Sequence, residues 1–254
     1  MKSPAGMKSV QTTAAKLRRP SARSSKRLRT MYERMVAEYG PQQWWPAATP
    51  FEVVIGAYLT QNTSWRAVER SILNLAAHEA LSVDGIRRLG EEELRQLIRP
   101  SGYMVRKAAA LKAFVDFLDR KYGGSLEALA AAPVSIAREQ LLVLPGVGPE
   151  TADAILLYAL GQPAMVVDEY LRRIVTRHRL LPDKAKYTEI QNFAIEALGD
   201  NAPETLVRHY NEFHALVVTV GKTHCGPMPK CEGCPLARFL PGEQSSRAKS
   251  LISR

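Results

Sequence analysis

Leu144-Pro-Gly-Val-Gly-Pro-Glu-Thr-Ala152 joins two segments of helical periodicity through two glycines that are one residue apart. Because Gly146 and Gly148 have no Cβ, the backbone can turn sharply there and expose successive N–H groups at the start of the second helix. N–H groups in front of a helix dipole favour a phosphate oxygen. The two glycines alone fit an ordinary turn between helices better, so the surrounding sequence has to distinguish the two interpretations.

Apolar residues on both sides of this turn recur with helical spacing. The pattern i, i+3, i+4, i+7, i+8 is found in three segments: Phe51, Val54, Ile55, Tyr58 and Leu59; Ala152, Ile155, Leu156, Ala159 and Leu160; Val167, Tyr170, Leu171, Ile174 and Val175. Such spacing places each set on one stripe of an α-helix. Since no segment alternates as a strand does, the sequence predicts an all-α protein of about ten helices.

The composition excludes a mostly disordered protein and a disulfide-rich miniprotein, because 46% of the 254 residues are hydrophobic and only three are cysteine. The net charge of +10 is unevenly distributed. Residues 1–30 hold nine of the 35 basic residues and none of the 25 acidic ones, which leaves +1 on residues 31–254. No segment reaches the ~18 apolar residues of a membrane helix, and we expect no membrane partner.

The basic segment at the N-terminus allows several interpretations. It is rich in Arg and Ser and lacks acids, as organelle transit peptides are, and a flexible arm that contacts phosphates fits as well. A third alternative is an upstream start codon, with the true start nearer Met7 or Met31. We expect a cytoplasmic protein associated with a bacterial nucleoid, or an organellar or nuclear one if the segment is a targeting signal.

The full string Leu-Pro-Gly-Val-Gly-x-x-Thr-Ala resembles the helix-hairpin-helix of the DNA glycosylase superfamily typified by endonuclease III. Met165-Val-Val-Asp-Glu-Tyr-Leu-Arg-Arg-Ile174 is similar to the family segment that carries the catalytic aspartate, and Asp168 follows Glu150 by 18 residues, which is the family's spacing. Gly102-Tyr-Met-Val-Arg-Lys-Ala108 and the cysteines also fall in the family's order. The resemblance covers roughly residues 30–235 and implies a monomeric enzyme that acts on damaged double-stranded DNA.

The fold implied by this resemblance is all-α and two-lobed, with a C-terminal loop that contains cysteines. Residues 51–160 would form a helical barrel lobe that ends in the helix-hairpin-helix. The other lobe would combine residues 30–50 with residues 161–221, and a Cys-rich loop would follow at 222–240. The remaining segments, a basic flexible tail at 1–29 and a second tail at 241–254, would lie outside both lobes.

Asp168 is the candidate catalytic residue. Its position before a helical stripe favours an N-cap, a role in which Asp is a preferred residue. The resemblance implies, in addition, that its carboxylate stabilises an oxocarbenium-like sugar or helps a water attack C1′ while the glycosidic bond breaks. His214 lies in the apolar helical segment Tyr210–Val218, which favours a core histidine over a site residue.

Contacts with DNA are assigned by resemblance to two loops. Leu59-Thr-Gln-Asn-Thr63 is similar to a family loop whose glutamine enters the DNA stack, and Gln61 is therefore predicted to fill the gap left by a flipped nucleotide. An amide that only caps its own loop is the alternative. In the hairpin, the predicted contact residues are Gly146, Val147, Gly148 and Thr151.

Glu150 departs from the pattern of glycosylases that also cut the strand. Those enzymes carry a lysine at this place, which attacks C1′ and forms a Schiff base, and a carboxylate cannot do so. Lys107 and Lys112 lie earlier in the chain, but nothing in the sequence places them at the sugar. The sequence predicts a monofunctional glycosylase. The rivals are an endonuclease III-like lyase for oxidised pyrimidines that uses another lysine, and a non-catalytic protein that binds damaged DNA.

All three tryptophans flank one helical unit, with Trp44 and Trp45 before it and Trp65 after the Gln61 loop. Composition alone favours core positions. Together with the motifs above they resemble the 3-methyladenine DNA glycosylase branch, in which aromatic residues are thought to sandwich the flipped base. A methylated purine is cationic, so stacking and cation–π attraction favour its binding. The predicted base pocket contains all three, with Trp44 and Trp65 as its walls and a core position as the alternative for Trp45.

Cys225-x5-Cys231-x2-Cys234 lies in a segment rich in Pro and Gly. Four thiolates normally hold a 4Fe-4S cluster, and endonuclease III has a fourth cysteine where this chain reads Pro-Leu-Ala-Arg-Phe-Leu240. The resemblance implies a cluster with three cysteine ligands and a fourth ligand of another kind. Zinc with His224 as a ligand, or no metal, are the alternatives. In each case the role would be structural or in docking DNA, with Lys222 and Lys230 near phosphates.

Overall fold

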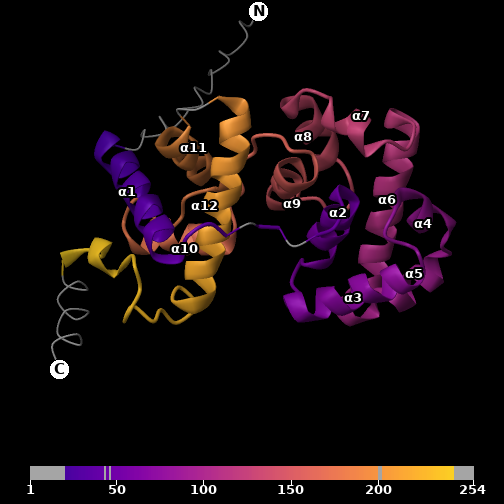
Figure 1. Cartoon of the computed structure of the whole chain (residues 1–254), viewed down its shortest axis with the longest axis horizontal. Helices are drawn as coiled ribbons and strands as arrows, with labels where there is room; N and C mark the ends of the chain where they lie inside the picture. The colour runs from indigo at the N-terminus through magenta and orange to yellow at the C-terminus, as the bar shows by residue number, and fades with distance from the viewer. Residues whose placement is uncertain (1–20, 43, 46, 200–201, 243–254) are drawn as a thin grey trace, which may run out of the picture.

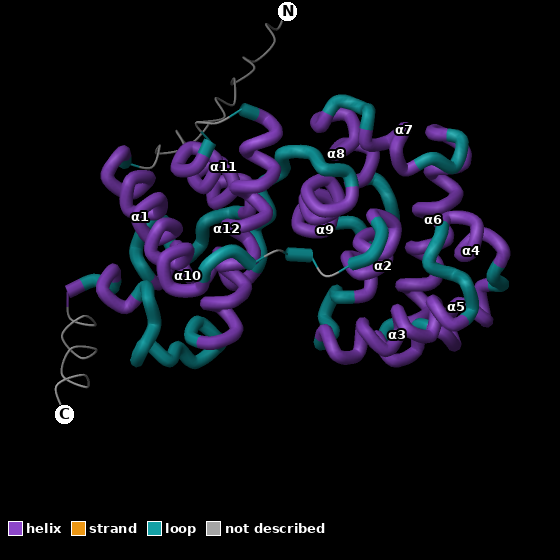
Figure 2. The backbone as a smooth tube through the Cα atoms, viewed as in Figure 1, coloured by secondary structure: helices purple, strands orange, loops and turns teal. Residues whose placement is uncertain are grey.

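The computed structural model describes residues 21–42, 44–45, 47–199 and 202–242, and in these ranges all regular structure is helical, as the sequence predicts (Figures 1 and 2). None of the described helices is long and apolar enough to cross a membrane. The helices are α1 (Ala22–Tyr39), α2 (Pro50–Leu59), α3 (Trp65–Ala77), α4 (Val83–Arg88), α5 (Glu91–Leu97), η1 (Arg99–Ser101), α6 (Met104–Tyr122), α7 (Leu126–Ala130), α8 (Val134–Leu142), α9 (Pro149–Ala154), η2 (Ile155–Ala159), α10 (Glu169–Arg177), α11 (Tyr187–Leu198), α12 (Pro203–Thr223) and η3 (Ala237–Phe239).

Figure 1 shows these helices in two groups. One group contains α2 to α9, and the other contains α1 together with α10, α11 and α12. In the second group α1 packs on α11 and α12, and α10 packs on α12. The N-terminal helix therefore lies among C-terminal helices, and the chain crosses between the groups twice, once before α2 and once after η2.

Helix α1 begins at Ala22, so residues 22–29, which the sequence analysis assigned to a flexible tail, belong to the folded part. Ser21 is the N-cap, and its side chain accepts a hydrogen bond from the Ser24 N–H. Leu28 is 1% exposed and packs in the core. Arg and Lys are good helix formers, so a basic segment can continue a helix while its apolar residue packs inward. Residues 1–20 and 243–254 lie outside the described part of the chain, and so do the interpretations of the N-terminal segment.

The turn between α8 and α9 has the geometry that its glycines allow. Gly146 has a φ of +77°, in the left-handed region, and a Cβ built on it would lie 3.3 Å from the Ala110 Cβ. Both observations favour glycine at this position. Pro149 occupies the first turn of α9, where its missing N–H costs no helical hydrogen bond.

After Ala154 the helix widens into a π-helical turn, η2, which changes the predicted stripe. Leu157 is buried and Ala159 is only half-buried, the reverse of the expectation from α-helical spacing. A π-turn inserts one residue into the repeat and rotates the following side chains. Tyr158, which was outside the predicted stripe, consequently points toward the other group of helices, where it contacts α12.

Asp153 connects the hairpin to the other group of helices. Its buried carboxylate accepts hydrogen bonds from Arg138 on α8, at 2.6 and 3.0 Å, and from Tyr187 and Gln191 on α11, each at 2.7 Å. Burial of the ring, followed by the nearby Asp153 carboxyl group, raises the pKa of Tyr187, so its hydroxyl remains a donor. A buried charge with four such donors fixes α9 relative to α11.

A close approach between α10 and α12 sets the position of Asp168. A Cβ built on Gly221 of α12 would lie 2.2 Å from the ring of Tyr170 on α10, much closer than van der Waals contact allows. The absence of a side chain at Gly221 therefore lets the first turn of α10 lie against α12.

Candidate active site

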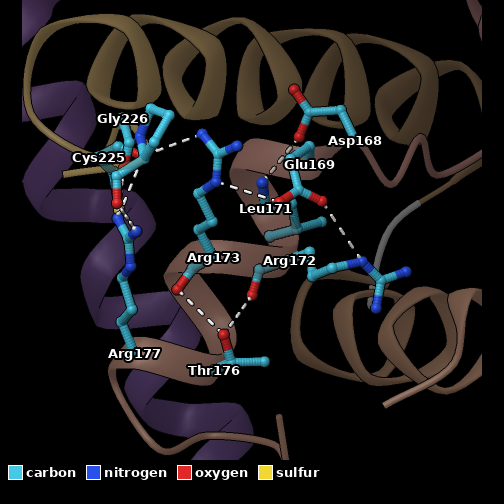
Figure 3. A network of polar contacts seen from close by, with 10 residues as sticks. Asp168, Glu169, Leu171, Arg172, Arg173, Thr176, Arg177, Cys225 and Gly226 are labelled. Carbon is cyan, nitrogen blue, oxygen red and sulfur yellow. Dashed lines mark hydrogen bonds and ion pairs between the residues drawn. The ribbon is translucent and has the colours of Figure 1, made fainter. Parts of the chain in front are cut away.

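Asp168 is the N-cap of α10, as the sequence predicts. Its Oδ1 accepts a hydrogen bond from the Leu171 N–H at 2.7 Å, and the residue is 9% exposed. Its Oδ2 lies 3.6 Å from the Nε2 of His214 on α12. Figure 3 shows Asp168 at the start of α10, beside α12. One oxygen of the carboxylate is thus fixed by the helix, and the second faces an imidazole.

His214 was expected to be a core histidine, and the structure corrects this interpretation. It is buried, but it lies against Asp168 and its Nδ1 is 2.5 Å from the hydroxyl oxygen of Tyr158. An apolar helix gave no signal for this role, because a buried site residue and a core residue share the same neighbours in sequence. Tyr158 was not identified, since the position depends on the π-turn of η2.

Glu150 lies in the first turn of α9; the residue as a whole is exposed, but protein atoms surround its carboxyl group. Loss of hydration against the surrounding protein, followed by repulsion from the Asp168 carboxylate, raises the pKa of Glu150 to about 7, although His214 and Arg172 act in the opposite direction. The structure therefore places the two carboxyl groups in one electrostatic environment. Glu150 can exchange a proton near neutral pH, which is the property of a general acid or base.

The raised pKa of Glu150 predicts a pH-dependent stability. The folded state holds this proton more tightly than the unfolded chain, whose glutamate has its ordinary value of 4.5, so stability from Glu150 is lost as the pH rises from about 4.5 to about 7. Glu150→Gln should raise the melting temperature above pH 7 and leave it unchanged below pH 4.5. Thermal melts across this pH range test the prediction, and Glu139→Gln, at an exposed position of α8, is the control. Equal melting temperatures at pH 8 would contradict it.

The three tryptophans form one cluster. Trp45 lies between the other two, with ring centroids 5.9 Å from Trp44 and 5.6 Å from Trp65, and its ring is 5.3 Å from that of Tyr158. The ring of Trp44 is covered by the ammonium of Lys222 at 5.4 Å. Trp45, for which a core position was the alternative to the pocket, is half-buried and is the tryptophan whose ring lies beside Tyr158. The prediction of pocket walls stays a prediction.

The Gln61 loop is attached to the hairpin. The Gln61 amide donates hydrogen bonds to the Gly146 carbonyl at 2.8 Å and to the Thr151 hydroxyl at 3.1 Å. The structure thus brings together predicted DNA contacts that are 85 and 90 residues apart in sequence. Gly148 is exposed beside them, whereas Val147 is 8% exposed and packs in the core. Val147 can therefore offer DNA its backbone more readily than its side chain.

Lys107, which is buried, binds both ends of the Gln61 loop. Its ammonium donates to the Leu59 carbonyl at 2.7 Å, the Ser101 carbonyl at 2.8 Å and the Thr63 hydroxyl at 2.9 Å. Burial lowers the pKa of Lys107 to about 8, but three acceptor oxygens match the three N–H bonds of the ammonium form. Lys112 is held in a similar way by the carbonyls of Ile86 and Arg87. Both lysines thus bind backbone oxygens of the α2–α9 group.

We expect Lys107→Met to lower the free energy of unfolding by about 3 kcal/mol, because it leaves three acceptor oxygens without their donor. The Gln61 loop should also lose order. Chemical denaturation measures the first effect and amide hydrogen exchange of residues 60–63 the second. Lys121→Met, at an exposed position of the same helix, is the control. A loss no larger than that of the control would show that the bonds of Lys107 add nothing.

The three cysteines line one cavity of about 210 Å³, which Arg177 and Leu240 also line. The guanidinium of Arg177 lies 3.2 Å from the Cys225 sulfur and donates to the Gly226 carbonyl at 2.8 Å (Figure 3). Burial raises the pKa of Cys234 to about 11. Among the described residues, no three His, Cys, Asp or Glu side chains lie close enough together to hold a single metal ion. Helix α10, whose N-cap is Asp168, thus contacts the cysteine loop through its last residue, Arg177.

Comparison with known proteins agrees with this geometry. Residues 55–198 match the model of the HhH-GPD superfamily of base excision DNA repair proteins. The chain is 43% identical over 210 residues, which is 82% of its length and 93% of the relative's, to a protein of Methanocaldococcus jannaschii named as a DNA repair glycosylase. It is also similar to the crystal structure of the H. pylori 3-methyladenine DNA glycosylase bound to 1,N6-ethenoadenine, with a TM-score of 0.67, 28% identity, and coverage of 78% of this chain and 97% of that one. A complex of endonuclease III with DNA shares the fold, with a TM-score of 0.73, 23% identity, and coverage of 89% and 98%.

Proposed function

The chain belongs to the HhH-GPD superfamily of base excision DNA repair proteins and is a DNA glycosylase, and on that basis we propose that it removes alkylated purines without cutting the strand. The observation that carries the second half of this proposal is Glu150, a carboxyl group in the electrostatic environment of Asp168.

DNA binding involves the hairpin and the loops beside it. Gly146 and Gly148 present backbone N–H groups at the start of α9, which suit a phosphate of the damaged strand. Gln61 is bound to the same hairpin, and we propose that its side chain enters the stack of DNA bases and fills the gap left by the flipped nucleotide. Tyr103 is an exposed side chain near the Gln61 loop: it is 62% exposed, and its ring centroid lies 5.9 Å from the ammonium of Lys107, which binds that loop. One buried lysine thus supports both loops.

Asp168 supplies the negative charge that bond cleavage requires. When the glycosidic bond breaks, positive charge develops on the sugar, and an ionised carboxylate fixed nearby stabilises it. The Leu171 N–H donates to one oxygen of Asp168 and holds the orientation of the carboxylate, so capping the helix and catalysis do not compete. For a binding protein without activity, capping of α10 would be the whole role of this carboxylate.

Glu150 explains why we propose release of the base alone. A Schiff base with C1′ requires an amine, and Glu150 cannot form one. Lys107 and Lys112, the two candidates considered from sequence, are held by backbone oxygens within the α2–α9 group. A carboxyl group with a pKa of about 7 can instead accept a proton from a water that attacks the sugar.

The aromatic cluster supports an alkylated purine as the substrate. The ring centroid of Trp45 lies 5.6 Å from that of Trp65, in a T-shaped arrangement, and 5.3 Å from that of Tyr158, which in turn contacts His214. A methylated purine is cationic, so it gains from aromatic faces, and its glycosidic bond is already weakened. The similarity to the H. pylori 3-methyladenine glycosylase supports the same choice.

The rate of base release from a panel of duplexes tests the substrate. Each duplex carries a single methylated purine, a single oxidised pyrimidine, or no damage, and the free base is measured under single-turnover conditions. We expect the methylated purine to be released fastest, and Trp45→Ala to slow this release by on the order of tenfold or more. Faster release of the oxidised pyrimidine would transfer the proposal to the endonuclease III-like alternative.

We propose that the cysteine loop holds an iron-sulfur cluster through Cys225, Cys231 and Cys234. A cluster spreads its thiolates around a body wider than one ion, and three thiols that line a single cavity fit this arrangement. Leu240 lines the same cavity, at the end of the segment where the family has its fourth cysteine. The cluster would stabilise the loop, which Arg177 ties to α10, and the arginine N–H near the Cys225 sulfur would stabilise its thiolate.

Leu240→Cys should therefore stabilise the cluster against loss of iron. Iron and acid-labile sulfide, together with the electron paramagnetic resonance spectrum, are measured in protein purified without oxygen and again after exposure to air. In the wild type we expect the iron without a cysteine ligand to be lost on oxidation, and in Leu240→Cys to be retained. Met228→Cys, at an 83% exposed position of the same loop, is the control. Zinc in place of iron, or equal retention in all three proteins, would contradict the proposal.

A further inference from the structure

Three buried or half-buried side chains from three different elements form a chain of polar atoms. Tyr158 of η2 contacts His214 of α12 at 2.5 Å, and His214 faces Asp168, the N-cap of α10, at 3.6 Å. His214 is 7% exposed, and its Nε2 has no hydrogen-bond partner among the described residues. A buried polar atom without a partner is costly, so its orientation toward a carboxylate needs an explanation.

The protonation of the two ring nitrogens follows from their neighbours. Burial, followed by the charges of Asp168 and Glu212, raises the pKa of Tyr158 well above its ordinary value, so its hydroxyl keeps its proton. This hydroxyl can donate to Nδ1, which leaves the imidazole proton on Nε2. The opposite tautomer would direct the lone pair of Nε2 at the carboxylate of Asp168. Electrostatics therefore favours an Nε2–H that points at Oδ2.

We propose that His214 is a positioning residue for Asp168, and that Tyr158 selects the tautomer in which the Nε2–H of His214 faces the catalytic carboxylate. The proposal rests on the function proposed above and adds two residues to it. At 3.6 Å the contact is longer than a hydrogen bond, so the imidazole restrains Oδ2 without neutralising its charge. The Leu171 N–H holds Oδ1 by a hydrogen bond, and the attraction of the Nε2–H limits rotation of Oδ2, so the two together restrict the plane of the carboxylate.

Tyr158 also connects this chain to the aromatic cluster. Its ring centroid is 5.3 Å from that of Trp45 and 5.7 Å from that of His214. A base that binds against Trp45 would restrict the ring of Tyr158, and through it the imidazole. The orientation of Asp168 is thereby linked to occupation of the pocket, and we expect Tyr158 and His214 to affect the rate of the chemical step more than substrate affinity.

Single-turnover release of the methylated base separates this role from packing. His214→Leu keeps the site apolar and filled but removes the Nε2–H, and we expect it to lower kcat by on the order of a hundredfold with little change in KM. His214→Gln keeps a donor near the position of Nε2 and should restore the rate to within about tenfold of the wild type. If His214 only fills the core, Leu should be tolerated at least as well as Gln, and this order of rates would overturn the proposal.

A double-mutant cycle tests the role of Tyr158. Tyr158→Phe keeps the ring against Trp45, removes the hydroxyl, and should slow the reaction by roughly tenfold in the wild type but not in the His214→Leu background. Equal effects in both backgrounds would show that the hydroxyl acts independently of His214. ¹⁵N shifts of the imidazole provide a second measurement and should show the Nε2–H tautomer only while Tyr158 is present. If the wild type releases no base from any duplex, the proposed function fails, and the tautomer measurement still tests the geometry.

Discussion

Asp168→Asn is expected to slow release of the damaged base by about a thousandfold while DNA affinity stays within a few-fold of the wild type. The amide is nearly isosteric with the carboxylate and can still accept the hydrogen bond from the Leu171 N–H, so α10 keeps its cap. What is lost is the negative charge beside the sugar at the moment when positive charge develops there. Single-turnover base release and equilibrium binding to the same duplex separate the two effects.

Glu169→Gln is the matched control for this variant. Glu169 follows Asp168 in the chain, is exposed, and pairs with Arg173 at 3.1 Å along the surface of α10. Its substitution removes one negative charge near the site but none that faces His214, and we expect the rate to change less than tenfold. Equal losses in the two variants would show that general electrostatics, and not a carboxylate at this position, supports the reaction.

Glu150→Lys is expected to convert the enzyme into one that forms a covalent complex with DNA. The family's strand-cutting members carry a lysine at this place in the hairpin, and the chain holds Glu150 in the first turn of α9 in the environment of Asp168. The nearby carboxylate would stabilise the ammonium, so the amine should react best at alkaline pH, where its free form is more abundant. Borohydride added during the reaction should trap a protein–DNA species that the wild type does not give.

Two further variants make this result interpretable. Glu150→Gln should give no trapped species, because an amide is not an amine, and Lys107→Met should leave trapping by Glu150→Lys intact, because Lys107 binds backbone oxygens instead of DNA. Trapping by the wild type would reveal another nucleophile and would revive the endonuclease III-like alternative. No trapping by Glu150→Lys, with base release retained, would show that Glu150 lies too far from C1′ for the role assigned to its position.

Much of the fold could be predicted from sequence because it depends on local spacing. The stripe at Phe51, Val54, Ile55, Tyr58 and Leu59 is buried throughout α2, and the glycine turn before α9 lies where the sequence places it. Asp168 was predicted to be an N-cap from its position, which the structure confirms, and its catalytic role, predicted by resemblance, stays a prediction. Gln61 and the hairpin were predicted separately, each by resemblance to one family, and the structure brings them into contact.

The remaining parts of the site depend on tertiary packing. Tyr158 reaches His214 because η2 widens into a π-turn, and no pattern of period 3.6 predicts such a turn. Phe213 and Ala215 flank His214 along α12 and give no sign of a site residue, and its partner Asp168 is the N-cap of another helix. The order of the three tryptophans in space, with Trp45 in the middle, could not be derived from their order in the chain.

The most direct test counts the products of one reaction. A duplex with one methylated purine is incubated with the wild type, the free base is quantified by mass spectrometry, and strand breaks are counted before and after alkali. The account predicts one alkali-labile site for each base released, with no breaks before alkali. Breaks before alkali that keep pace with base release would contradict it, because they require a nucleophile that Glu150 cannot provide.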